Sequence, residues 1–338
     1  MATLLELRRR VRSVKNMRQI TRAMKLVSGA KLRRAQDAML AARPYSDKMW
    51  EVLGGLAQVG DDDVEHPLLA ERPEEHVTAV VVTSDRGLCG GFNSNVLRYS
   101  HRALDVWQDR AVTVVTAGSK GWDHFRNREW EVEKADDELL KNLSYTRAAA
   151  LAGYLIESFE RQTTDAVYLI YNEFVSALSQ RLIVEQLLPV RDLPFETPDE
   201  VSFHEASRAY AAARAVGEVP EGFGAIGAVA SALGTATEEA RDFAATAGPP
   251  VEIVDYLYEP SAGAILEEIL PRFVETQVHQ ALLESTAAEH AARMAAMDNA
   301  TKNAEELIAN LTLTMNKLRQ EAITTEILEV VGGAEALR

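Results

Sequence analysis

The sequence predicts a mixed α/β protein in which long helices from the two ends of the chain form a coiled coil and the middle forms a mostly parallel sheet. Apolar residues recur at steps of three and four at both ends of the chain. Between them, from residue 76 to 195, short β-branched segments alternate with helical ones, which is typical of a parallel sheet covered by helices. The periodicity at the ends fits an antiparallel or a parallel helix pair.

The C-terminal segment, residues 264–338, is predicted to be one helix. Its apolar seam comprises Ala304, Leu307, Leu311, Met315, Leu318 and Ala322. At 1.5 Å per residue this helix would reach about 110 Å, which exceeds the diameter of a compact domain of this mass. Its end carries further apolar residues, namely Ile323, Ile327, Leu328, Val330, Val331 and Leu337. Because such a tip would aggregate if it stayed exposed, we expect a partner with an apolar sleeve.

The N-terminal segment, residues 1–58, offers the matching stripe. This stripe comprises Leu4, Leu7, Val11, Val14, Met17, Ile20, Met24 and Val27. Alone it would fit a core face as well as a coiled coil, and the matching C-terminal stripe favours the coiled coil. Pro44 predicts an interruption or a bend, because proline lacks a backbone donor. Residues 59–75 are polar and predict a linker.

The middle segment, residues 76–195, predicts an α/β domain. Strands are expected at 76–84, 111–116 and 166–171, helices at 119–127 and 144–161, and an added strand at 175–189. A glycine-rich turn at 85–95 leads into another helix, with Asn93 or Ser94 as its expected cap. Residues 196–250 are rich in Ala and Gly and predict an insertion, either a solvated loop excursion or a regulatory element. Residues 251–260 predict a returning strand.

The charge is strongly uneven along the chain. The 36 basic and 51 acidic residues give a net charge of −15, which argues against a general polyanion binder. Yet no Asp or Glu occurs from Leu7 to Gln36, a stretch rich in Arg and Lys. Aromatic residues do not interleave with these cations, so we expect an acidic protein surface as the partner and not nucleic acid. No run of 18 apolar residues and no signal peptide is found, so any membrane role is expected to be peripheral.

No stretch of the sequence predicts catalysis. The turn DRGLCGGFN has neither the dinucleotide nor the P-loop fingerprint, and we interpret its glycines as allowing a tight turn. Asp85 and Arg86 are expected to pair locally or at a contact surface. Cys89, the single cysteine, excludes an internal disulfide and is expected to be buried. We predict no catalytic residue, no cofactor and no metal site. Two rival interpretations are an enzyme with a site at Gly87–Gly91 and a static coiled-coil adaptor.

Three blocks of the chain resemble one known family. They are RSVKNMRQITRAMKLVSGAKLRRAQ at 12–36, TSDRGLCGGFNSN at 83–95, and AARMAAMDNATKNAEEL at 291–307 with the closing NKLRQEAITTEILEVVGGAEAL. In this order they resemble the gamma subunit of F-type ATP synthase. The resemblance covers the chain except residues 196–250. It implies an antiparallel coiled coil of the termini and a Rossmann-like domain.

The resemblance also implies a function without an active site. The chain would be the central-stalk rotor inside a ring of three alpha and three beta subunits, and its foot would bind the epsilon subunit and the membrane ring of c subunits. Proton flow would turn the rotor, on the cytoplasmic face of a bacterial plasma (inner) membrane. The partner-binding residues it implies form three groups. They are the basic collar Arg8, Arg9, Lys25, Arg33 and Arg34, the loop contact Met24 with Lys25, and the rotational catch Arg293, Gln320 and Thr324.

One departure from the family concerns the insertion. It lies where chloroplast gamma subunits carry a redox-regulated segment, but it contains no cysteine, which excludes a dithiol switch. A neutral insertion is the simpler interpretation. The alternative hypothesis is a thiol-independent brake on ATP hydrolysis, which unchanged hydrolysis and synthesis rates after deletion of residues 201–248 would rule out.

Overall fold

The computed structural model describes residues 3–59, 66–136, 138–177, 179–190 and 261–336. The predicted insertion at 196–250 and the predicted strand at 251–260 lie outside these residues. The described chain divides into two compact units. The helix-pair unit contains Met1–Lys31, Leu88–Gly90 and His290–Arg338, and the sheet unit contains Leu32–Gly87 and Gly91–Glu289.

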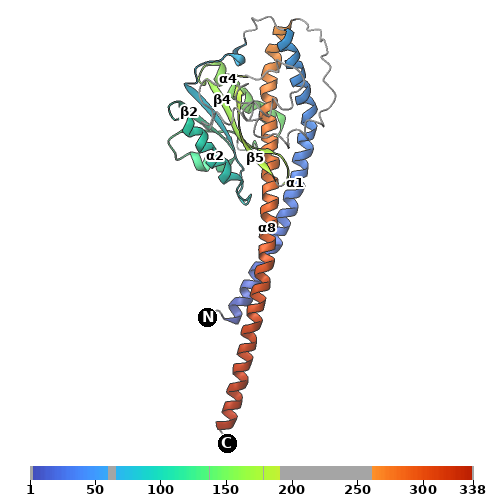
Figure 1. Ribbon diagram of the computed structural model, residues 1–338, viewed down its shortest axis with the longest axis vertical. Coiled ribbons are helices and arrows are strands. Elements are labelled where there is room, and N and C mark those ends of the chain that lie inside the picture. The colour runs from blue at the N-terminus through green and yellow to red at the C-terminus, as the bar shows by residue number, and fades with distance from the viewer. Residues whose placement is uncertain (1–2, 60–65, 137, 178, 191–260, 337–338) are drawn as a thin grey trace, which may run out of the picture. The chain divides into compact units, whose positions relative to one another are not determined.

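Two long helices contribute to both units (Figure 1). They are α1, Leu4–Val59, and α8, Ala262–Ala336. Because α1 continues through Pro44, the interruption predicted there as one alternative is wrong. Met49 and Leu53 are buried on the following turns, and the Ser46 hydroxyl donates a hydrogen bond to Gln280 Oε1 at 3.2 Å. This packing holds the helix despite the one donor that the proline removes.

The sheet unit has the expected alternation of strands and helices. Its elements are β1 (His76–Val82), α2 (Phe92–Val106), β2 (Ala111–Ala117), α3 (Ser119–Phe125), β3 (Glu131–Lys134), α4 (Tyr145–Glu160), β4 (Ala166–Phe174) and β5 (Gln180–Leu188), with a 3₁₀ turn at Pro67–Leu69 before them. The strand order is β3-β2-β1-β4-β5. The first four strands are parallel, and β5 pairs antiparallel with β4. The predicted mixed α/β fold with a mostly parallel sheet is confirmed.

Each face of the sheet has its own core. Val96 and Leu104 of α2 and Phe125 of α3 pack with Val77 and Val81 of β1 on one face. On the opposite face lies a second cluster with residues of α4, α1 and α8. It includes Leu155, Phe159, Leu53, Leu270 and Val274, packed with Val80 and Val82. Since a parallel sheet is buried on both sides, six of the seven β1 residues are buried, and all of these except Thr78 are apolar.

Two local predictions need correction, and one strand was missed. The edge strand β3 was not predicted, because Glu131–Lys134 is polar and has no apolar run. The segment predicted as a polar linker contains Leu68, which is fully buried in the core. The cap of α2 is Gly91, not Asn93 or Ser94. The Asn93 side chain instead accepts a hydrogen bond from the backbone N–H of Ser84 at 3.0 Å.

Candidate partner-binding surface

The helix pair is antiparallel. Thr21 Oγ1 lies 2.8 Å from Thr301 Oγ1, and Lys25 Nζ donates to Asp298 Oδ1 at 2.5 Å. Farther toward the start of α1, Arg18 faces Glu305 at 3.9 Å. Continuing this register places Leu4, the first residue of α1, opposite the segment around Leu318. Beyond that segment α8 continues to Ala336 with no α1 residue opposite it (Figure 1).

The buried seam of α1 differs from the predicted one. Leu7, Val11, Thr21 and Ser28 are buried in a strict heptad register. By contrast, Met17, Ile20 and Val27 are 57%, 58% and 57% exposed, so their assignment to the seam is wrong. The predicted stripe takes three successive steps of three residues from Val11 to Ile20, and each such step rotates the stripe away from a seam of period 3.5.

The seam prediction for α8 is only partly right. Ala304 is buried, and Leu311, Met315 and Leu318 are half-buried. Leu307 is 47% exposed, and Ala322 is exposed because it lies beyond the start of α1. The last described part of α8 therefore presents apolar side chains without cover from α1. They include Ile323, Ile327, Leu328 and Val330.

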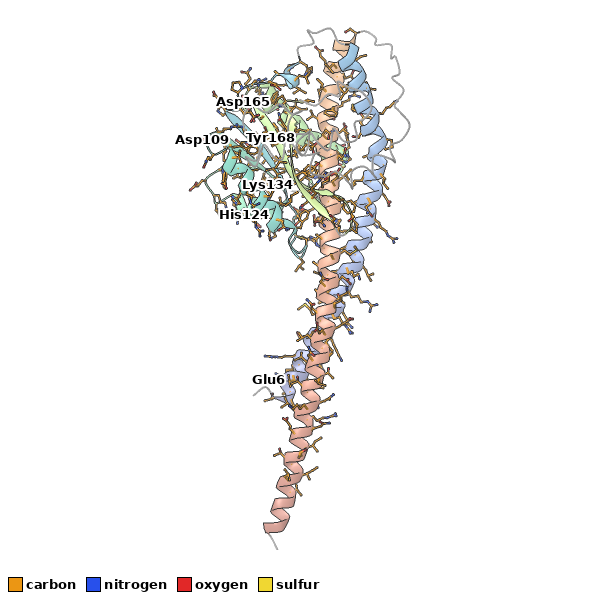
Figure 2. All side chains as sticks on the ribbon, viewed as in Figure 1. Glu6, Asp109, His124, Lys134, Asp165 and Tyr168 are labelled. Atoms are coloured by element: carbon orange, nitrogen blue, oxygen red, sulfur yellow. The ribbon has the colours of Figure 1, made fainter. Side chains whose placement is uncertain are left out.

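The basic residues differ in what they contact. Arg8 and Arg9 are exposed in the helix-pair unit, where Figure 2 labels Glu6 near the start of the same helix. Lys25 is half-buried by its ion pair with Asp298, and Met24 beside it is also half-buried. The hydrogen bond from Lys25 is the first cause that holds the pKa of Asp298 below its usual value. Lys25 thus serves the helix pair itself.

Arg33 and Arg34 are exposed as well, but they belong to the part of α1 in the sheet unit. The six residues of the predicted collar and loop contact therefore do not share one environment. Four of them are exposed arginines, and the other two, Met24 and Lys25, are half-buried in the helix-pair unit.

The three predicted catch residues do not lie together. Gln320 and Thr324 are exposed one turn apart, and the Thr324 hydroxyl donates to the Gln320 carbonyl at 2.9 Å. Arg293 lies about 40 Å away along the helix at 1.5 Å per residue. It is half-buried, with Nη1 at 3.3 Å from His290 Nδ1. Arg319, which the sequence reasoning missed, is exposed directly before Gln320. Its positive charge next to Gln320 in the sequence is the signal that could have found it.

His290 is held neutral in the helix-pair unit. Burial, with the nearby charges of Arg293 and Lys31, lowers its pKa to about 4. A neutral imidazole can accept a hydrogen bond through Nδ1, so it suits the adjacent guanidinium. Arg293 is thereby fixed on the helix surface and is less free to turn toward a partner than Arg319.

The residues of the glycine-rich turn at 85–95 make contacts within the protein itself. Asp85 Oδ1 accepts hydrogen bonds from the backbone N–H and the hydroxyl of Ser119, both at 3.0 Å. The carboxylate thus takes the position at the start of α3 where a bound anion would lie. Cys89 is buried, as predicted, and a side chain at Gly90 would come within 3.7 Å of Ala296 of α8. The turn is used for packing and capping.

The described residues contain neither a metal-binding cluster nor a membrane-spanning helix. Among them, no group of three or more His, Cys, Asp or Glu side chains could hold a metal ion. Within the same ranges, none of the helices combines the length and the apolar character needed to cross a bilayer.

Comparison with known proteins gives a match along the whole chain. A family model described as ATP synthase matches residues 3–337. The ATP synthase gamma chains of Pelotomaculum thermopropionicum and Geobacter metallireducens are each 42% identical, over 337 and 340 residues. That of Anaeromyxobacter sp. strain Fw109-5 is 44% identical over 342 residues. Each alignment covers 100% of this chain and 100% of the relative.

Solved structures share the fold at low sequence identity. A chain in the Euglena gracilis mitochondrial ATP synthase, OSCP/F1/c-ring, aligns with a TM-score of 0.58 and 21% identity, over 99% of this chain and 94% of that chain. A chain in the rotor of the same enzyme aligns with a TM-score of 0.53 and 20% identity, over 95% and 98%.

Proposed function

Since the chain belongs to the family of ATP synthase gamma chains, we propose that it is the central-stalk rotor subunit of an F-type ATP synthase. It couples proton-driven rotation of the membrane c-ring to ATP synthesis, and ATP hydrolysis to the reverse rotation, with no active site of its own. Its partners are the alpha and beta subunits, the epsilon subunit and the c-ring. It associates with the cytoplasmic face of the bacterial inner membrane through the complex.

One observation carries the proposal. The antiparallel pair ends where α1 begins, and α8 continues alone with exposed apolar side chains, among them Ile327 at 57% and Val330 at 68%. Such side chains gain free energy only when a partner covers them. A single helix that extends beyond the helix pair is what a ring of alpha and beta subunits could enclose while the chain rotates inside it.

A rotor of this kind needs contacts on one side of the shaft, so that the three beta subunits are contacted differently. To shift one catalytic beta site from 1:99 to 99:1 between two states, the shaft must favour one of them by about 5.5 kcal/mol. Exposed cations at Arg8 and Arg9 offer part of that bias toward acidic loops, and Arg33 and Arg34 extend the set along α1. Each exposed ion pair is worth about 1 kcal/mol or less, so the bias must be shared among several contacts that can also release.

We assign the rotational catch to Gln320 and Thr324 together with Arg319. Gln320 and Thr324 are exposed one turn apart on the same face of α8. The exposed Arg319 lies about 100° around the helix from Gln320, so a beta subunit that wraps this part of the helix would contact all three. Arg293, which the sequence interpretation assigned to the catch, would then contact a different level of the ring.

The test mixes this chain with its cognate alpha and beta subunits and compares ATPase turnover with and without it. We expect a complex and a strong rise in turnover. The triple change of Arg319, Gln320 and Thr324 to Ala should lower that turnover, and Arg293→Ala should lower it less. A complex with unchanged turnover would favour a static adaptor, and the absence of a complex would refute the proposal.

A further inference from the structure

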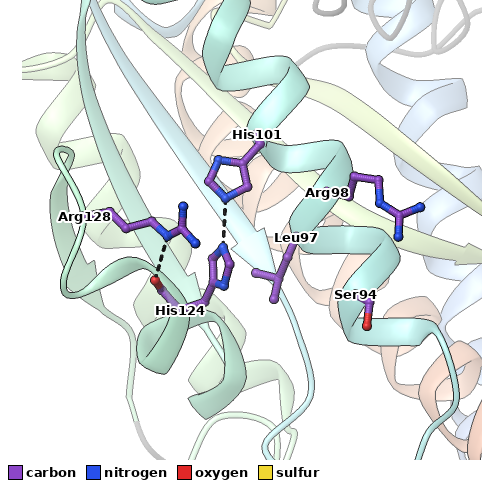
Figure 3. A pocket seen from close by; sticks show the side chains of 6 residues that line it. All are labelled: Ser94, Leu97, Arg98, His101, His124 and Arg128. Atoms are coloured by element: carbon purple, nitrogen blue, oxygen red, sulfur yellow. Dashed lines mark hydrogen bonds between the residues drawn. The ribbon is translucent and has the colours of Figure 1, made fainter.

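A groove lies between α2 and α3 on the outer face of the sheet unit. It has a volume of 470 Å³, and the side chains of Ser94, Leu97, Arg98, His101, His124 and Arg128 line it (Figure 3). The α2 residues follow the helical spacing of one face, and the other two come from the end of α3 and the turn after it. None of the partner-binding residues assigned above lines this groove.

The groove is lined by hydrogen-bond donors and has no lining carboxylate. In a chain of net charge −15, two arginines face the same groove. Arg128 donates through Nε to the His124 carbonyl at 3.2 Å, a hydrogen bond that does not use its two Nη groups. Among the described residues, neither Arg98 nor Arg128 has a carboxylate partner. Six other arginines of the sheet unit do, namely Arg110, Arg126, Arg147, Arg161, Arg181 and Arg272.

The two histidines point at each other. His101 Nε2 and His124 Nε2 are 2.8 Å apart, so one ring donates the shared hydrogen bond and the other accepts it (Figure 3). Burial, and then the charge of Arg128, lowers the pKa of both. Asp105, one turn after His101 on α2, raises the pKa of His101 to a smaller extent. Both rings are therefore neutral at neutral pH. Because their Nε2 atoms share one proton, the pair as a whole would gain one further proton, at Nδ1 of the donating ring, if a negative charge entered the groove.

We propose that this groove binds the phosphate group of a phosphate ester. Arg128 and the two imidazoles contact the phosphate oxygens, because a guanidinium fork and imidazole N–H groups match them in geometry and charge. The volume lies within the range of small-molecule sites, so it leaves room for an organic group beside Leu97 and Arg98. The ester could come from a nucleotide or from the headgroup of an anionic phospholipid. The proposal does not depend on the rotor function.

A cation is the competing ligand. Paired imidazoles can bind a transition-metal ion, but two arginines in the same lining repel it. Arg128→Gln separates the two cases because it removes a charge that attracts phosphate and repels a metal. Arg128 is exposed, so the variant should fold like the parent. Arg126→Gln is the matched control. Arg126 lies at the same C-terminal end of α3, forms an ion pair with Asp123 and does not line the groove.

The experiment titrates the full chain with inorganic phosphate, AMP and glycerol 3-phosphate by calorimetry, and with phosphatidylglycerol or phosphatidylcholine vesicles by sedimentation. We expect one of the esters or the anionic vesicles to bind, with AMP indicating a nucleotide source and phosphatidylglycerol a lipid source. Arg128→Gln should weaken binding about tenfold or more, since it removes charge-assisted hydrogen bonds. Arg126→Gln should change it by less than about twofold.

NMR titration provides a further readout. On binding, the pKa of the His101–His124 pair should rise, which a purely structural pair would not show. Equal losses in the Arg128 and Arg126 variants would reduce the effect to general charge and overturn the proposal. Absence of binding by every phosphate compound would also overturn it, as would tighter Zn²⁺ binding to Arg128→Gln without phosphate binding.

Discussion

Met17 and Met297 test the helix pair with the same substitution in two environments. Both lie in the helix-pair unit, but Met17 is 57% exposed and Met297 only 5%. Replacing the buried methionine by Ala removes apolar contacts and leaves a cavity, so Met297→Ala should destabilise the pair by about 2–5 kcal/mol. Met17→Ala removes at most the covered part of its side chain, about 0.6–1.3 kcal/mol when a full burial is worth about 1.5–3 kcal/mol.

Assembly should reverse the order of the two variants. If the alpha and beta subunits cover the exposed part of Met17, its loss costs about 0.9–1.7 kcal/mol of binding, or roughly a five- to twentyfold weaker complex. Met297 is already buried, so Met297→Ala should leave the affinity of the folded chain nearly unchanged.

Hydrogen exchange of peptides from residues 4–31 measures the local opening free energy, and titration of the alpha–beta ring measures assembly. If Met17→Ala opens the pair as much as Met297→Ala does, or leaves assembly unchanged, the assignment of Met17 to a partner-facing surface is refuted.

Two further predictions concern stability. Gly118→Ala should destabilise the sheet unit by about 2–6 kcal/mol in thermal melting, because Gly118 has a φ of 109° and the added Cβ would lie 2.3 Å from the Thr83 carbonyl oxygen. The control Gly153→Ala, in helix α4 with open space around it, should instead stabilise by about 0.5–1 kcal/mol. The second concerns pH. The hydrogen bond from Lys25 lowers the pKa of Asp298 below its usual value of 3.8. The ionised Asp298 therefore stabilises the folded helix pair fully above pH 3.8, and this stabilisation is lost as the pH falls through the lower pKa of the folded state. Asp298→Asn should remove this part of the acid dependence of the helical circular dichroism signal, and an unchanged acid profile would contradict the assignment.

The sheet was predictable because its strands are buried on both faces. A strand such as β1, covered by α2 on one side and by α4 on the other, is mostly apolar and β-branched, and this composition predicts it from the sequence. The edge strand β3 has only one neighbouring strand and a polar sequence, so its existence depends on pairing with β2 and not on its own pattern. Leu68 was missed for a similar reason, since one buried side chain in a polar segment has no periodicity.

The contact residues were harder to predict than the fold. In α1 the seam contains Thr21 and Ser28, while the apolar Met17 and Ile20 face outward. Apolar periodicity therefore selects residues of the exposed face and of the seam together. The two can be separated only when the opposing helix is known, as the contact between Thr21 and Thr301 shows.

The turn after β1 explains how a fold typical of nucleotide enzymes can serve a subunit without chemistry. In such folds the turn at the carboxyl end of the first strand offers free amides to a phosphate. Here Asp85 of that turn accepts a hydrogen bond from the amide of Ser119 at the start of α3, and Gly90 of the turn lies against Ala296 of α8. A phosphate at the start of α3 would have to displace the carboxylate, and a phosphate at Gly90 would meet the packed helix. The groove between α2 and α3 has neither obstacle, because its donors face a cavity with no lining carboxylate. Any phosphate chemistry of this chain should therefore be sought there, away from the turn that the fold class suggests.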